Sequence, residues 1–144
     1  MKIIHNDYPE VNIREFVNKY NISTYDVEIY IYKFNDIVSL HNKCGTDCFG
    51  NNSVGLFEHQ KNKVNVYIND NNYKSDTDKT LDIKYILTHE LKHLSQYKLN
   101  KEGYIYSFEN NDDYMSNPYE IEAYEFADKI IDIEELNVDK LQYI

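Results

Sequence analysis

The stretch "YILTHELKHLSQY", residues 85–97, contains the pattern His-Glu-x-x-His at His89, Glu90 and His93. Leucines, isoleucines and tyrosines recur around it at helical spacing, which predicts an amphipathic helix over about residues 80–98. At about 100° per residue, His93 lies about 40° around the helix from His89, so both imidazoles project from one side, one turn apart. Two ligands of one tetrahedral metal ion require this arrangement.

Glu90 is predicted to lie within the apolar arc of this helix, between Tyr97 and Ile83. An ionised carboxylate is costly in such a place unless an opposite charge compensates it, and a nearby divalent ion would do so. The alternative is an ordinary amphipathic helix, whose histidines hydrogen-bond in the core and whose glutamate reaches solvent.

A catalytic zinc site needs a third protein ligand and keeps its fourth position for water. The sequence does not match the metzincin pattern, which requires Gly at position 96 and His at position 99, because this chain has Gln96 and Leu99 there. The remaining histidines all precede the motif: His5, His41 and His59. A downstream ligand must therefore be a carboxylate, and "NPYEIEAYEFADKII", residues 117–131, offers three of them: Glu120, Glu122 and Glu125.

Helical periodicity separates these three glutamates. Glu120 shares one face with Ala123 and other small or apolar residues, whereas Glu122 and Glu125 project from the opposite, solvated face. Small residues let two helices approach closely enough to share a metal. We therefore predict Glu120 as the third ligand, with Glu122 or an acid of the preceding loop, such as Asp112 or Asp113, as alternatives.

The combination of "HELKH" with "NPYEIEAYEFA", whose Glu120 lies 27 residues after His93, resembles the gluzincin metallopeptidases. The compact members are the most similar: the minigluzincins, with an Asn-Pro-x-Glu-x-Glu-Ala segment, and the ImmA/IrrE-type peptidases, with Glu-x-x-Ala followed by Phe-Ala. The resemblance covers about residues 53–131 and implies zinc ligands His89, His93 and Glu120, with Glu90 as general base.

The chain departs from that family pattern in two respects. Many gluzincins have Asp or Asn four residues after the ligand glutamate, where it braces a ligand histidine, that is, holds its ring in position. This chain has Tyr124 there. Either the Tyr124 hydroxyl or another group would have to brace the histidine. No helix-turn-helix or sensor segment is recognisable, so a regulatory role does not follow from the resemblance.

The expected fold is one α+β domain over residues 1–144, with a zincin-like arrangement. A small, mainly antiparallel sheet would pack on the active-site helix and on a second helix that carries the third ligand. We expect "VNVYI", residues 64–68, to be either an edge strand that could bind a peptide or an interior strand. The other predicted elements are helices at 9–20 and 117–131, a short helix near 36–43, strands at 25–34, 53–59 and 63–69, loops at 44–52 and 100–116 with an extended piece at "YIYSF", and a short helix or tail after 131.

Cys44 and Cys48 are the two cysteines of the chain, separated by three residues. We interpret them as free thiols near a turn. A redox pair or an auxiliary metal site is the alternative, although a structural zinc site needs four ligands.

A formal net charge of -10 disfavours binding to nucleic acid or to anionic membranes. No segment has the length and apolarity of a signal peptide or a membrane span, so we expect a cytoplasmic protein. The expected activity is zinc-dependent endopeptidase hydrolysis of a peptide or protein substrate by a metal-activated water, with Glu90 as base. The alternatives are a metal-stabilised binding or regulatory module without turnover, and a structural domain without metal.

Overall fold

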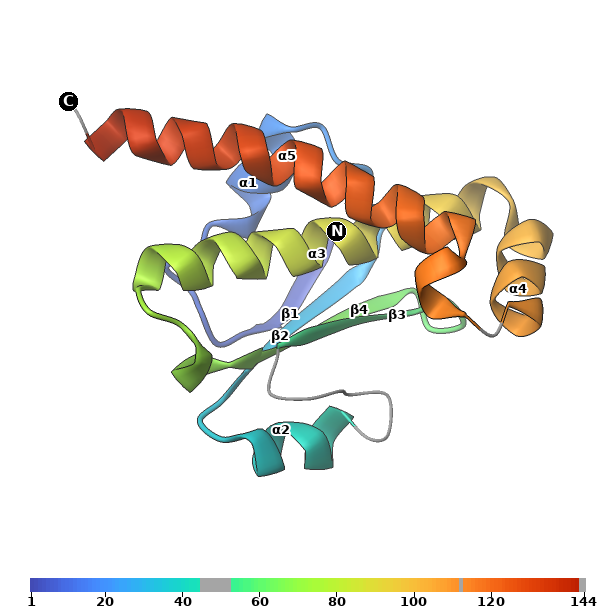
Figure 1. Ribbon diagram of the computed structural model, residues 1–144, viewed down its shortest axis with the longest axis horizontal. Coiled ribbons are helices and arrows are strands. Elements are labelled where there is room, and N and C mark those ends of the chain that lie inside the picture. Colours follow the sequence, from blue (N-terminus) through green and yellow to red (C-terminus); the bar gives the residue numbers. More distant parts are fainter. Residues whose placement is uncertain (45–52, 112, 143–144) are drawn as a thin grey trace.

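The computed structural model of the chain describes residues 1–44, 53–111 and 113–142. It is an α+β domain, as predicted from the sequence (Figure 1). Among the described residues, no helix has the length and apolarity needed to cross a membrane. The helices and strands are, in chain order, β1 Lys2–Asn6, α1 Ile13–Lys19, β2 Glu28–Phe34, α2 Ile37–Cys44, β3 Val54–Glu58, β4 Lys63–Asn69, α3 Asp76–Leu99, α4 Lys101–Asn110 and α5 Pro118–Gln142.

The four strands form one mixed sheet in the order β1-β2-β4-β3. The β1–β2 and β2–β4 pairs are parallel, and only β3–β4 is antiparallel. The expectation of a mainly antiparallel sheet is therefore wrong. The hairpin is a local pattern that a sequence reveals, whereas the parallel pairs arise from crossovers between distant segments. Among the described strands, β4, which contains "VNVYI", is an interior strand, and β1 and β3 are the two edges.

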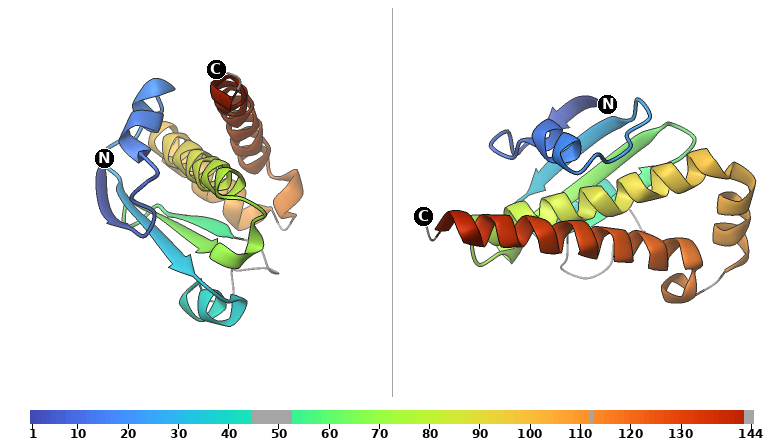
Figure 2. Two further views of the ribbon diagram at one scale, coloured as in Figure 1. Left: turned by 90° about the vertical axis from the view of Figure 1, so that its left-hand side faces the viewer. Right: turned by 90° about the horizontal axis from the view of Figure 1, so that it is seen from above.

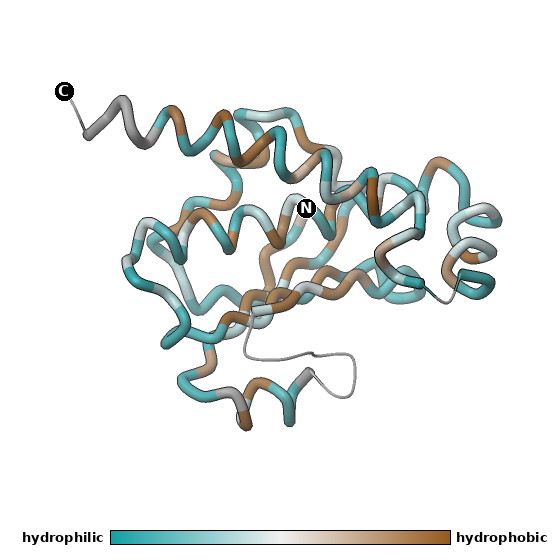
Figure 3. The backbone as a smooth tube through the Cα atoms, in the orientation of Figure 1, coloured by the Kyte–Doolittle hydropathy of each residue, from teal (hydrophilic) through white to brown (hydrophobic). Residues whose placement is uncertain are grey.

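The helices cover the sheet on two sides (Figure 1, Figure 2). α3 crosses one face and α5 packs along α3, while α2 lies on the opposite face. Figure 3 shows the apolar residues along the strands, flanked by hydrophilic loops. The fully buried side chains that α3 and the central strands contribute to the core are Ile29, Ile31, Val64, Val66, Ile68, Ile83, Leu87, Leu91 and Leu94.

Residues 101–110 form helix α4, although a loop with an extended piece was predicted there. The Asn100 side chain caps the helix by accepting a hydrogen bond from the backbone N–H of Gly103, at 3.0 Å. Tyr104 is 7% exposed, and its ring contacts the rings of Phe57, Tyr97 and Tyr119. This tertiary packing stabilises a helix whose alternating Tyr-Ile-Tyr sequence suggests a strand.

The remaining differences lie near the ends of the chain. β1 was not predicted, and α5 continues as one helix where a short helix or tail was expected. The predicted loop at 44–52 lies almost entirely outside the described residues. The interpretation of Cys44 and Cys48 also concerns side chains outside the described part of the structure.

Candidate metal centre

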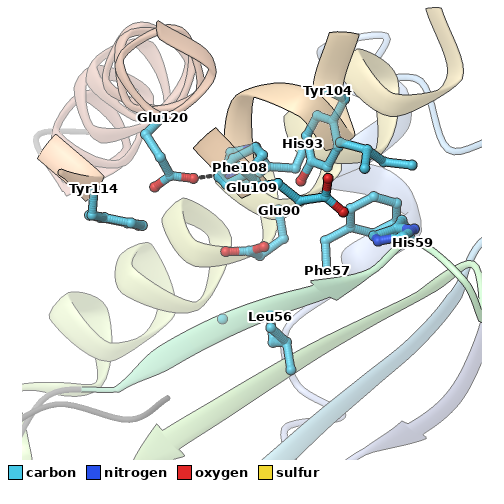
Figure 4. A pocket seen from close by; sticks show the side chains of 12 residues that line it. Leu56, Phe57, His59, Glu90, His93, Tyr104, Phe108, Glu109, Tyr114 and Glu120 are labelled. Atoms are coloured by element: carbon cyan, nitrogen blue, oxygen red, sulfur yellow. Dashed lines mark ion pairs between the residues drawn. The ribbon is translucent and has the colours of Figure 1, made fainter. Parts of the chain in front are cut away.

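Helices α3 and α5 bring His89, His93 and Glu120 together in the interior. One donor atom from each residue lies within 4.8 Å of the others, and all three side chains are buried. His89 Nε2 is 3.1 Å from His93 Nε2 and 3.5 Å from Glu120 Oε2. Glu120 Oε1 contacts His93 Nε2 directly (Figure 4). The inward orientation predicted for Glu120 is therefore confirmed.

The chemistry of these donors fits a metal ion. Two imidazole nitrogens and a carboxylate are common ligands of divalent transition metals. Glu120 Oε2 is buried and makes no hydrogen bond of normal geometry, so it has capacity for a cation. Of the alternative ligands, Glu122 is exposed and Asp113 accepts a hydrogen bond from the Met115 backbone at 3.1 Å, while Asp112 lies outside the described residues.

Electrostatics in this cluster favours a charged Glu120. Burial alone would raise the pKa of its carboxyl group, but the His89 and His93 imidazoles outweigh burial and lower the pKa to about 2. Burial alone would lower the pKa of His93, and the neighbouring Glu120 carboxylate reverses this and raises it. The carboxylate is therefore ionised at neutral pH and available to a cation.

Glu90 lies beside the cluster without joining it. It is 8% exposed, and its Oε1 is 4.0 Å from His89 Nε2. Burial raises the pKa of the Glu90 carboxyl group, while the charges of the two histidines and a hydrogen bond from the Phe57 backbone oppose the rise. A carboxylate with a raised pKa is suited to accept a proton near neutral pH.

Gln96 connects the two ligand-bearing helices. Its Oε1 lies 2.8 Å from His93 Nδ1, and its Nε2 donates to the Tyr119 backbone carbonyl at 2.9 Å and to Glu122 Oε1 at 3.1 Å. From the sequence we interpreted Gln96 only as a break in the metzincin pattern. The available signal was its position three residues after His93, on the same side of α3.

Tyr124 occupies the position where many gluzincins have a bracing Asp or Asn. Its ring packs against His89, with centroids 4.2 Å apart, and its hydroxyl lies 3.0 Å from the Tyr114 hydroxyl. His89 Nδ1 is buried without a hydrogen-bond partner in the described structure. Tyr124 therefore supports His89 by packing and does not brace it through a hydrogen bond.

A pocket with a volume of about 350 Å³ opens next to this cluster. Figure 4 shows Glu120 and Tyr114 on one side of it and Phe57 and His59 on the other. Helix α4, the element missed from the sequence, contributes the aromatic residues Tyr104 and Phe108 to its wall.

Comparisons with known proteins were made with the whole chain. It matches no protein-family model, no curated protein and no solved structure. The candidate metal centre is therefore supported by its own geometry: three convergent donors, a buried carboxylate beside them and an adjoining pocket.

Proposed function

We propose that this chain is a zinc-dependent peptidase of gluzincin type with a zincin-like fold. The observation that carries the proposal is the buried cluster of His89, His93 and Glu120 with Glu90 at its side, open to a pocket. Zinc suits this set, because two neutral imidazoles and one carboxylate leave a fourth position for water. The proposal also retains two sequence-based predictions, a peptide or protein substrate and a cytoplasmic location.

The proposed chemistry is hydrolysis of a peptide bond. When bound, zinc would polarise the scissile carbonyl and lower the pKa of the attacking water. Glu90 takes the proton from that water and delivers it to the leaving amine. Its position supports this role, because burial raises the pKa of the Glu90 carboxyl group and so makes its carboxylate a stronger base.

Tyr114 is our candidate donor to the oxyanion of the tetrahedral intermediate. Its side chain lines the pocket next to Glu120, and its contact with Glu120 lowers the pKa of that carboxyl group. The residue is 52% exposed, and its hydroxyl lies 3.0 Å from the Tyr124 hydroxyl. A hydroxyl beside the metal ligands is well placed to stabilise charge that develops on the substrate oxygen.

Strand β3 is our candidate substrate-binding edge. Within the described part of the chain it pairs with β4 alone, and its residues Gly55, Leu56 and Phe57 line the pocket. A peptide in extended conformation can add to such an edge as a further strand through backbone hydrogen bonds. Its alternate side chains would then point toward the aromatic wall formed by Tyr104 and Phe108. We retain endopeptidase cleavage as the proposed mode of action.

The test is cleavage of a proteome-derived peptide library by the zinc-loaded protein, with the new termini identified by mass spectrometry. The wild-type protein is expected to cut, to stop when a chelator removes zinc and to recover when zinc is restored. Glu90→Gln is expected to retain zinc and to lose cleavage. A zinc-loaded wild-type protein that leaves the whole library intact would instead indicate a metal-stabilised module without turnover.

A further inference from the structure

Gln96 is a buried polar residue in contact with both halves of the metal centre. It is 4% exposed, and it projects from α3 toward the first turn of α5, where Glu120 lies. Its amide makes three hydrogen bonds. One joins it to His93, a candidate metal ligand, and the other two join it to Tyr119 and Glu122, which lie close to Glu120 in the sequence. A buried side chain amide with its donors and acceptor all paired has one preferred orientation.

The partners determine which way the amide points. The Tyr119 carbonyl and the Glu122 carboxylate can only accept hydrogen bonds, so the NH₂ group of Gln96 must face them. The Gln96 carbonyl oxygen then faces His93 Nδ1, 2.8 Å away, and only a protonated Nδ1 can donate to it. With Nδ1 carrying the proton, His93 presents Nε2 to the cluster, where Glu120 and His89 Nε2 lie.

We propose that Gln96 is a positioning residue for the metal centre. Through Oε1 it sets the tautomer and ring orientation of His93. Through Nε2 it holds the turn of α5 that carries Glu120 against α3. One side chain thereby aligns two of the candidate ligands, which come from two different helices. The inference rests on the metal site of the proposed function and does not depend on peptide cleavage.

The experiment compares zinc affinity in two variants by competition with a chromophoric chelator. Gln96→Met keeps the length of the side chain and removes all three hydrogen bonds. The control is Thr88→Val, since Thr88 is fully buried on the same helix and its hydroxyl donates to the Lys84 carbonyl of that helix, at 2.7 Å. We expect Gln96→Met to lose about 10- to 100-fold in zinc affinity, and Thr88→Val to stay within about twofold of the wild type.

Equal affinity of Gln96→Met and the wild type would overturn the inference. An equal loss in both variants would overturn it as well, because that result indicates general destabilisation of α3. NMR of the zinc-loaded wild-type protein gives an independent readout that needs no folded variant. The inference predicts a slowly exchanging Nδ1–H proton on His93, and its absence contradicts the assignment. A wild-type protein that cleaves no peptide would change neither the zinc affinities nor the His93 NMR signal. The proposed peptidase activity and the proposed role of Gln96 can therefore be refuted independently of each other.

Discussion

Gly55 of β3 lies directly against Glu90 of α3. A Cβ atom at position 55 would lie 2.7 Å from Glu90 Cγ, 3.0 Å from Glu90 Oε1 and 2.6 Å from Ile86 Cγ2. Real Cβ atoms do not approach other atoms this closely, so either the strand or the carboxylate would have to move. The absence of a side chain at Gly55 therefore sets the distance between the proposed substrate edge and the proposed base.

We accordingly predict that Gly55→Ala impairs catalysis without removing the metal. A displacement of about 1 Å in a catalytic group can cost about 100-fold in rate, and a loss of this order is expected in kcat/KM. None of the three candidate ligands is among the atoms nearest to the added methyl group, so zinc content should stay at the wild-type level. Cleavage at the wild-type rate by a folded Gly55→Ala protein would show that this contact does not position the base.

Tyr114→Phe should lower kcat by about 100-fold with little change in KM, because an oxyanion donor acts mainly in the transition state. Steady-state kinetics on the best substrate from the library measures both constants. Tyr106→Phe is the matched control, since Tyr106 lies on neighbouring α4 with 70% exposure and does not line the pocket. If the two variants behave alike, Tyr114 is not the donor.

Glu134 should make the fold sensitive to acid. Its carboxylate is 5% exposed as part of α5 and accepts hydrogen bonds from Lys19 at 2.9 Å, Tyr20 at 2.9 Å and Lys84 at 3.0 Å. Burial alone would raise the pKa of Glu134, but these partners outweigh burial and lower it. Because the folded-state pKa of Glu134 is below the ordinary value, the ionised Glu134 carboxylate contributes its full stabilisation of the fold above the ordinary pKa of glutamate. This stabilisation is lost as the pH falls through the folded-state pKa.

Chemical denaturation at pH 7 and at acid pH measures this contribution. Glu134→Gln should lower the free energy of unfolding by about 2 kcal/mol at pH 7 and by less at acid pH. Glu135→Gln is the control, because the neighbouring carboxylate is exposed. The same loss at both pH values would mean that the ionisation of Glu134 does not carry the effect.

The three residues of the candidate metal centre could be grouped from the sequence because helical periodicity relates residues within one helix. His89 and His93 are one turn apart, and Glu120 shares its apolar face with Ala123, which is fully buried in the structure. The role of Gln96 could not be predicted in the same way. Its partners Tyr119 and Glu122 belong to another helix, and no pattern local to α3 encodes that contact.

The errors in the fold have a similar origin. Helix α4 depends on ring contacts between Tyr104 and residues of β3, α3 and α5, whereas its local sequence alternates like a strand. Strand β1 leaves Ile4 50% exposed and lacks a regular alternation of buried and exposed residues. Its pairing with β2 is visible only once the crossover through α1 is known. Short elements stabilised by distant partners are thus the ones that sequence patterns miss.

The central claim is that α3 and α5 build one metal centre from His89, His93 and Glu120, and zinc binding by Glu120→Gln tests it most directly. The comparison is with Glu125→Gln, an exposed position of the same helix. We predict about one zinc per chain for the wild type and for Glu125→Gln, and a much weaker affinity for Glu120→Gln, because a neutral amide is a poor zinc ligand. Wild-type zinc affinity in Glu120→Gln would contradict the account.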